Sequence, residues 1–294
     1  MPSLKQINTK IASIKGTRRI MSAMKLIAAG KMQRTQAALK AHRVYVDAYT
    51  RVARGVLGSC GPDAHPLLSR PSGNGKTHLV FLTSDRGLCG NYNNVLIKGL
   101  DSFLADRGFG GDDVKLTFIG NKGKNFFGAR GFELGSYYTG VSEKNCGEVA
   151  DEISSLVSKE FAAGETGEAV LVHSAFISAL SRETVFETLL PLEIEAGEEG
   201  GGEPAPAVFE PSKRGILDGL IPEYLRMRVE KAILESLTSE HSARMTAMES
   251  ATNNADELIR DLTLLFNKTR QAIITTELMD IVNGTEALRE GGND

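Results

Sequence analysis

One ten-residue stretch has the residue types and the setting of a phosphate-binding turn. SDRGLCGNYN (residues 84–93) follows an apolar run at 78–84 that predicts a buried strand, and it opens a segment at 91–107 that predicts a helix. At this point of a parallel α/β sheet, glycine backbone and a helix N-terminus can hold a phosphate. The glycine spacing differs from GxGxxG, however. The alternative is that Gly87 and Gly90 permit a tight turn while Asn91 caps the helix.

Two other glycine-containing segments fit a phosphate site less well. GNGKT (residues 73–77) has Arg70 where a P-loop has its first glycine, and it precedes a predicted strand where a P-loop follows one. GNKG (residues 120–123) comes after the second predicted strand and is better explained as a turn. We therefore expect the first segment to be a loop and the second to be a turn.

The histidines and cysteines form no recognisable catalytic or metal-binding pattern. The five histidines lack HExxH spacing, and we expect His173, on a predicted buried strand, to be a hydrogen-bonded core residue. Cys60, Cys89 and Cys146 are odd in number and widely separated, which disfavours a disulfide framework and favours a reducing compartment. Cys89 is expected to be a structural thiol. The sequence predicts no catalytic residue, no cofactor and no metal.

Two long predicted helices enclose the segments described so far. Residues 223–283 contain neither Gly nor Pro, and their apolar residues recur at alternating spacings of three and four, which is typical of a coiled coil. This seam consists of Met248, Ala251, Ala255, Leu258, Leu262 and Leu265. The N-terminal residues repeat the spacing at Leu4, Ile7, Ile11, Ile14, Met21, Ala28 and Met32, with Arg18 and Lys25 as interruptions. We expect this first helix to end near residues 55–62.

Between the two helices, strand and helix patterns alternate. Strands are expected at 78–84, 114–120, 132–139, 169–178 and 184–192, and helices at 91–107, from 122, and at 148–162. The last two strands suit an antiparallel hairpin. The predicted class is α/β with a long coiled coil, in which the N- and C-terminal helices pair antiparallel around an inserted Rossmann-like domain. The predicted parts are 1–58 (helix), 76–192 (α/β domain), 193–211 (acidic Gly/Pro-rich linker) and 212–290 (helix).

The net charge of −3 conceals a strongly basic N-terminal segment. Residues 1–54 contain 12 Lys or Arg against the single Asp47. Such an arm fits an anionic partner such as nucleic acid, or alternatively a helix face that is simply solvated. No apolar run reaches the ~18 residues of a membrane span, and no cleavable targeting segment is visible.

Three stretches together resemble the γ-subunit family of F-type ATP synthases. They are SAMKLIAAGKM (22–32), SDRGLCGNYN (84–93) and the C-terminal run SARMTAMESATNNADELI (242–259) with NKTRQAIITTELMDIVNGTEAL (267–288). Their order and separation extend the resemblance over essentially the whole chain. Gly284 and Thr285 stand where the family usually has Gly-Ala. The cysteine-bearing insert of chloroplast members is lacking, and the bacterial form is favoured.

The resemblance implies a central-stalk rotor subunit without catalytic residues of its own. Its implied partners are the α and β subunits of the hexamer, the ε subunit and the ring of c subunits, with no nucleic acid and no membrane span. Its implied location is the cytoplasmic face of the inner membrane, as a peripheral part of the complex. Rotation of the ring would turn the shaft and drive ATP synthesis or hydrolysis at the β sites. Acidic loops of β would face the basic helix.

Six residues match the β-contact and coupling positions of the family. They are Met24, Arg244, Arg270, Gln271, Thr275 and Glu277. Arg270 and Gln271 match the pair that contacts β by polar interactions. The alternative for each of the six is an ordinary solvated helix position.

Two other functional classes remain open at this point. A nucleotide- or phosphate-binding enzyme with a helical oligomerisation arm would bind its ligand at residues 84–93. A nucleic-acid-binding coiled coil would use residues 1–54, with steeply salt-dependent affinity.

Overall fold

The computed structural model describes residues 3–58, 64–71, 75–179, 181–192 and 212–290, so Cys60 and the predicted 193–211 linker lie outside the described residues. The chain divides into two compact units: residues 28–246, here called the main unit, and residues 1–27 with 247–294, here called the terminal pair. Each unit is described by itself below. Helices α1 (Leu4–Leu57) and α5 (Lys213–Glu290) contribute to both.

Local sequence explains where α1 begins. The Ser3 hydroxyl accepts from the Gln6 amide nitrogen at 3.3 Å, and the Gln6 side-chain oxygen accepts from the Ser3 amide nitrogen at 3.0 Å. This reciprocal pair is a capping box, which satisfies two amides that a helix start leaves free. The last turn closes where the Gly58 amide donates to the Arg54 carbonyl at 2.8 Å.

Helix α5 extends beyond the Gly- and Pro-free run at 223–283 and nearly fills the predicted helical part at 212–290. It begins at Lys213, includes Pro222, and continues past Gly284. Proline removes one helical hydrogen bond, and here the loss is offset by packing. Leu217, Ile221 and Leu225, on both sides of the proline, are all buried in the apolar core of the main unit.

The main unit contains a five-stranded sheet in the order β3-β2-β1-β4-β5. The strands are β1 (Lys76–Leu82), β2 (Val114–Ile119), β3 (Glu133–Tyr138), β4 (Thr166–Phe176) and β5 (Arg182–Leu190). The helices between them are α2 (Tyr92–Asp106), α3 (Asn121–Phe127) and α4 (Cys146–Ala162). All pairings are parallel except β4 with β5, which form the predicted antiparallel hairpin. The predicted α/β class is confirmed.

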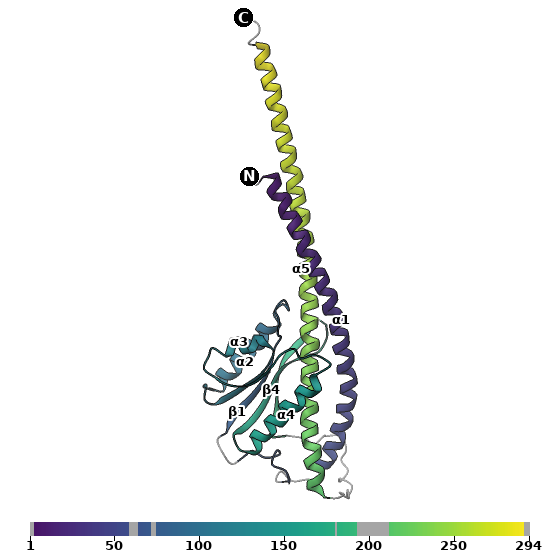
Figure 1. Ribbon diagram of the computed structural model, residues 1–294, viewed down its shortest axis with the longest axis vertical. Helices are drawn as coiled ribbons and strands as arrows, with labels where there is room; N and C mark the ends of the chain where they lie inside the picture. The colour runs from purple at the N-terminus through teal and green to yellow at the C-terminus, as the bar shows by residue number, and fades with distance from the viewer. Residues whose placement is uncertain (1–2, 59–63, 72–74, 180, 193–211, 291–294) are drawn as a thin grey trace. The chain divides into compact units, whose positions relative to one another are not determined.

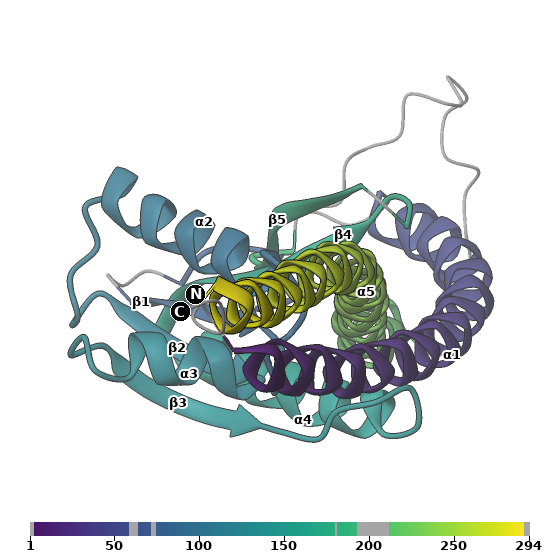
Figure 2. The same ribbon diagram turned by 90° about the horizontal axis from the view of Figure 1, so that it is seen from above.

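Helices cover both faces of this sheet (Figures 1 and 2). Leu79 and Phe81 of β1 belong to one apolar cluster with α2 and α3, whereas Val80 and Leu82 belong to a second cluster with α4, α5 and part of α1. Burial on both faces explains why this strand is a continuous apolar run instead of an alternating one.

The terminal pair is an antiparallel coiled coil whose seam partly differs from the predicted one. Met248 and Ala255 are buried as expected, but Leu258 and Leu265 are 44% and 42% exposed. Ile259 and Phe266 are half-buried in their place. A straight helix advances about 100° per residue, so position 266 returns to the face of Met248, whereas position 265 is about 100° away. The strict 3-4 repeat was therefore wrong in the later turns.

Candidate functional site

In a doubly wound sheet, ligands bind at the carboxyl ends of the strands where the strand order reverses. Here that point lies between β1 and β4. The turn that follows β1 is the 84–93 segment singled out from the sequence. The turn and the residues that contact it decide whether this crevice is open to a ligand.

The 84–93 turn is held together by its own polar side chains. The amide and the hydroxyl of Ser84 both lie 3.0 Å from Asn93 Oδ1. Asp85 joins the turn to the loop at Gly140, whose amide donates to Oδ2 at 2.8 Å, and to the first residue of α3, Asn121, whose amide donates to Oδ1 at 3.2 Å. Three residues of the turn, Ser84, Asp85 and Asn93, thus serve the fold.

The expected cap at Asn91 was wrong, and of the two glycines expected to permit the turn only Gly90, not Gly87, has a positive φ. Asn91 precedes α2 but makes no side-chain capping bond, and Asn93 takes the ordering role instead. The left-handed backbone conformation occurs at Gly90 (φ 60°), as a glycine permits, and at Leu88 (φ 64°), where a side chain disfavours it. Cys89 is buried and free, in agreement with a structural thiol.

Helix α5 occupies the crevice with a row of polar contacts. Tyr92 is the first residue of α2, and its hydroxyl lies 2.7 Å from the hydroxyl of Ser236 on α5. After β4, the Ser242 hydroxyl donates to the Ala179 carbonyl at 2.5 Å. Arg244 Nη2 lies 3.2 Å from the Arg86 carbonyl and 3.3 Å from the Gly87 carbonyl. Helix α5 therefore lies against one side of the turn, while Gly87, Gly90 and Lys122 line an open hollow of about 410 Å³ on another side.

Arg244 is the centre of a charged cluster beside this turn. Its Nη1 donates to Glu240 Oε1 at 2.6 Å. Burial raises the pKa of Glu240 from its ordinary value, and the charge of Arg244 opposes that rise. Burial, together with the charges of Arg244, Lys31 and Arg34, lowers the pKa of His241 to about 4. His241 is therefore neutral at physiological pH, and all three sequence motifs contribute residues to this neighbourhood.

A second charged group joins three elements of the main unit. Glu235 of α5 accepts from Arg43 Nη2 of α1 at 2.7 Å, and its other oxygen lies 3.4 Å from His173 Nε2 of β4. His173 is buried, but its Nδ1 has no hydrogen-bond partner among the described residues. The expectation of a fully hydrogen-bonded core histidine was therefore only half right.

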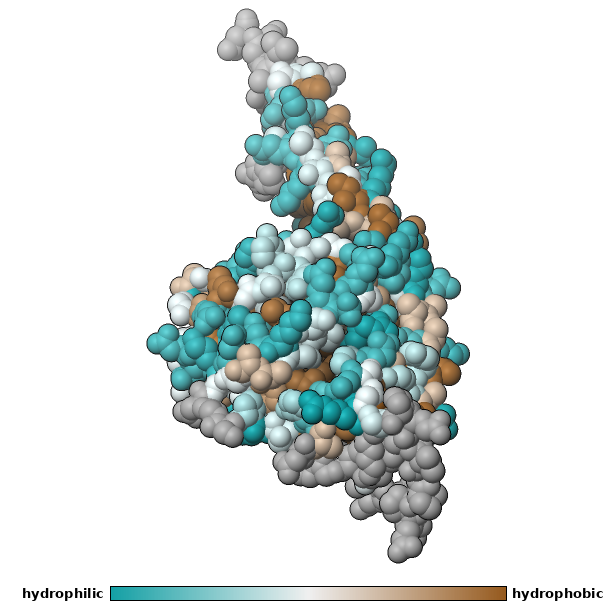
Figure 3. Space-filling model, turned by 60° about the horizontal axis from the view of Figure 1, so that its bottom comes forward, coloured by the Kyte–Doolittle hydropathy of each residue, from teal (hydrophilic) through white to brown (hydrophobic). Residues whose placement is uncertain are grey.

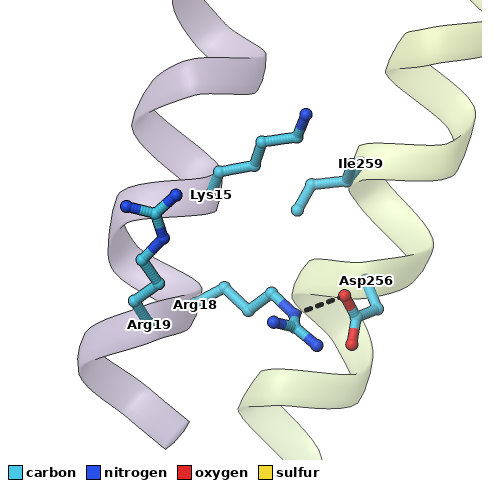
Figure 4. Close-up of a pocket in the computed structure, with 5 residues that line it drawn as sticks. All are labelled: Lys15, Arg18, Arg19, Asp256 and Ile259. Atoms are coloured by element: carbon cyan, nitrogen blue, oxygen red, sulfur yellow. Dashed lines mark hydrogen bonds and ion pairs between the residues drawn. The ribbon is translucent and has the colours of Figure 1, made fainter. Parts of the chain in front are cut away.

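In the terminal pair, the two charged interruptions of the predicted seam form ion pairs across it. Arg18 Nε donates to Asp256 Oδ1 at 2.5 Å, and Lys25 Nζ to Glu249 Oε1 at 2.6 Å. Figure 4 shows Arg18 reaching across to Asp256. Lys15, Arg19 and Ile259 complete the lining of an open hollow of about 230 Å³. The basic residues of α1 thus contact acidic residues of α5 at two seam positions and leave further cations exposed.

Five of the six residues expected to contact β lie on exposed or half-buried positions of the terminal pair, and Arg244 is the exception. In the terminal pair, Met24 is half-buried on α1, and Arg270, Gln271, Thr275 and Glu277 are exposed on α5. Gln271 and Thr275 share one face of the helix, because the Thr275 hydroxyl donates to the Gln271 carbonyl at 2.9 Å. Arg244 belongs to the main unit.

The α5 segment that carries four of these residues has no helical partner among the residues that the structure describes. Every residue from 270 to 285 is exposed. Its large apolar side chains are 41–63% exposed: Ile273, Ile274, Leu278, Met279, Ile281 and Val282. In Figure 3, apolar side chains appear on the surface among the polar ones of the helices. Exposed apolar groups in such number mark an interaction surface.

The described residues contain no group of three or more His, Cys, Asp or Glu side chains placed to bind a metal ion. No helix in the described part of the chain combines the length and apolar character needed to cross a bilayer.

Comparison with known proteins agrees with the fold. Residues 3–288 match the family model described as ATP synthase. Similar solved structures include a chain of the Euglena gracilis mitochondrial ATP synthase (OSCP/F1/c-ring; TM-score 0.65, 18% identity, 99% of this chain and 96% of that one). Another is a chain of the Tetrahymena thermophila mitochondrial ATP synthase central stalk and c ring (TM-score 0.58, 24% identity, 79% and 99%).

Full-length relatives place the chain within a family. An ATP synthase gamma chain from Anaeromyxobacter sp. (strain Fw109-5) is 39% identical over 292 residues, covering 98% of this chain and 100% of the relative. The gamma chain from Geotalea uraniireducens is 38% identical over 295 residues with the same coverage. Arg244 connects the 84–93 and 242–259 motifs in the structure. Because the family model also matches residues 3–288 and the relatives match over nearly the whole chain, this chain belongs to the ATP synthase γ-chain family.

Proposed function

We infer that this chain is the central-stalk rotor subunit of an F-type ATP synthase. In this role it is not catalytic itself and couples rotation of the c ring to ATP synthesis or hydrolysis at the β subunits. The observation that carries the proposal is the α5 segment 270–285, which has no helical partner among the described residues and exposes large apolar side chains to water. A family shaft that inserts into an α/β hexamer accounts for that surface.

The partner surfaces follow from the same arrangement. We propose that Met24 and the α5 residues Arg270, Gln271, Thr275 and Glu277 contact β, where exposed donors and acceptors on a helix suit polar recognition. The exposed cations beside Arg18 suit acidic loops of β. The ε subunit and the c ring are the proposed partners of the main unit. The complex would lie at the cytoplasmic face of the inner membrane, with this chain as a peripheral subunit.

The nucleotide-binding enzyme is the less supported alternative. Its ligand would have to enter the crevice after β1, where Tyr92, Ser242 and Arg244 join the sheet to α5. Equilibrium dialysis of the full chain against ATP and ADP distinguishes the two functions. We expect no saturable binding, and stoichiometric binding that Arg244→Gln alters would favour the enzyme.

The rotor function is tested by reconstitution. We expect the chain to co-purify with α and β subunits as one copy per three of each, and to be required for ATP hydrolysis by the complex. With the membrane sector added, hydrolysis should pump protons. A chain that stays apart from α and β, or that leaves their ATPase activity unchanged, would overturn the proposal.

A further inference from the structure

The Arg244 guanidinium donates its hydrogen bonds to acceptors within the same chain. Nη1 is bonded to Glu240, and Nη2 lies within 3.3 Å of the carbonyls of Arg86 and Gly87. Only 14% of the Arg244 side chain is exposed. An arginine with its guanidinium so engaged is poorly placed to donate to another subunit.

The backbone carbonyls bound by Arg244 belong to the part of the turn with a disfavoured conformation. The two carbonyls immediately precede Leu88, whose left-handed conformation is disfavoured for a residue with a side chain. Leu88 is 62% exposed, so core packing does not hold it there. Ser84 adds one bond from within the turn, because its hydroxyl donates to the Arg86 carbonyl at 2.7 Å. Arg244 supplies the support from α5.

We propose that Arg244 is a positioning residue, which fastens the 84–93 turn to α5 and thereby fixes the surface that the turn presents to a partner subunit. This assignment rests on the proposed rotor function and changes the expected role of Arg244 from direct contact with β to action through the turn. The fork of the guanidinium is essential, because it reaches the turn and Glu240 together.

Trypsin offers a direct test, because it cleaves after Arg86, an exposed residue whose carbonyl accepts from Arg244. In the full chain, Arg244→Gln should raise the cleavage rate of the Arg86–Gly87 bond by at least about fivefold, since local opening becomes easier. Arg244→Lys, which keeps the charge without the fork, should give an intermediate rate. The matched control is Arg228→Gln. Arg228 is also 14% exposed and binds Glu187 and the Thr188 carbonyl, but not the turn.

A second measurement follows the thiol beneath the turn. Cys89 is buried, with its Sγ 3.2 Å from Asn93 Nδ2. With Cys60 and Cys146 replaced by Ser, alkylation of Cys89 should accelerate in Arg244→Gln by a factor similar to that of the cleavage, and not in Arg228→Gln. Unchanged cleavage and unchanged alkylation in Arg244→Gln would overturn the positioning role.

The reconstituted complex separates this proposal from the rotor function. We expect Arg244→Gln to lower the ratio of proton pumping to ATP hydrolysis, with Arg244→Lys between it and the unmodified chain. If the ratio falls while the turn remains as protected as in the unmodified chain, Arg244 acts by direct contact and the positioning role is wrong. If the unmodified chain itself fails to assemble with α and β, the rotor function fails, whatever the turn does.

Discussion

His78 and Glu160 form a buried hydrogen-bonded pair in the main unit, with His78 Nδ1 2.8 Å from Glu160 Oε2. The other ring nitrogen lies 2.8 Å from the Thr117 hydroxyl, and Lys115 Nζ donates to Glu160 Oε1 at 2.7 Å. Every polar atom of the histidine ring is satisfied, although the residue lies in the middle of the sheet. The bond from His78, assisted by Lys115, lowers the pKa of Glu160 to about 2.

This pair predicts an acid-dependent stability. Because the folded-state pKa of Glu160 is below its ordinary 4.5, its stabilising contribution is fully present above pH 4.5 and is lost as the pH falls toward 2. At pH 7, Glu160→Gln should lower the free energy of unfolding of the main unit by about 2 kcal/mol. Hydrogen exchange of β1 and β2 peptides in the full chain measures this loss, and the difference from the unmodified chain should shrink between pH 4.5 and 2.

The control for Glu160 is Glu133→Gln. Glu133 also pairs with a lysine, Lys76, at 2.6 Å, but both side chains are more than 40% exposed. A solvated pair contributes little, so this variant should exchange like the unmodified chain. Equal losses in the two variants would show that the buried network has no special weight.

The hydroxyl of Tyr92 provides a second stability test. Tyr92→Phe keeps the buried ring and removes the bond to Ser236, which leaves a buried hydroxyl without its partner. We expect the free energy of unfolding to fall by about 1–2 kcal/mol. Tyr137→Phe is the control, because Tyr137 is 53% exposed. Denaturant unfolding, monitored by hydrogen exchange of α2, measures the free energy of unfolding. If Tyr92→Phe and Tyr137→Phe both unfold like the unmodified chain, the bond to Ser236 does not stabilise the fold.

The ion pair of Arg18 with Asp256 should depend on salt. Both side chains are about 40% exposed at the seam, so their coupling is screened as ionic strength rises. A double-mutant cycle of Arg18→Ala and Asp256→Ala, read from hydrogen exchange of α1 residues 4–27, should give a small favourable coupling at low salt and none at 1 M NaCl. Arg19→Ala, at the exposed neighbouring position, should show no coupling with Asp256→Ala at either salt concentration.

The exposed end of α5 should govern assembly. Arg270→Ala combined with Gln271→Ala removes the polar groups proposed to contact β, and should weaken binding to the α/β hexamer by about tenfold. Lys268→Ala, an exposed change two residues before Arg270, is the control. Titration of the labelled chain into the hexamer checks this, and equal affinities for both variants would remove Arg270 and Gln271 from the proposed contact.

The fold was predictable where local pattern and burial agree. The apolar run of β1 and the change from helical to strand periodicity gave the sheet, and the hairpin of β4 and β5 followed from a short connection. Element ends were less predictable, because packing overrides local preference. Pro222 lies inside α5, as the predicted 212–290 helix requires, because the surrounding leucines and isoleucine are buried, whereas proline's local preference alone would begin the helix there.

The site was less predictable, because its decisive contacts join distant parts of the chain. Arg18 and Lys25 looked like defects in an apolar seam, and their acidic partners lie more than 220 residues away. The glycine-containing turn looked open to phosphate, and only the tertiary structure shows Arg244 and Ser242 of α5 against this crevice. Sequence pattern identifies the turn, but not what lies over it.

The apolar end of α5 also bears on the life of the chain before assembly. Six large apolar side chains at residues 273–282 are exposed, and no described part of the chain packs against this stretch of helix. A copy synthesised in excess of its partners keeps this surface uncovered, where it favours self-association and recognition by chaperones and proteases. The apolar residues proposed to contact the α/β hexamer thus make the cellular amount of this subunit depend on balanced synthesis of the other subunits.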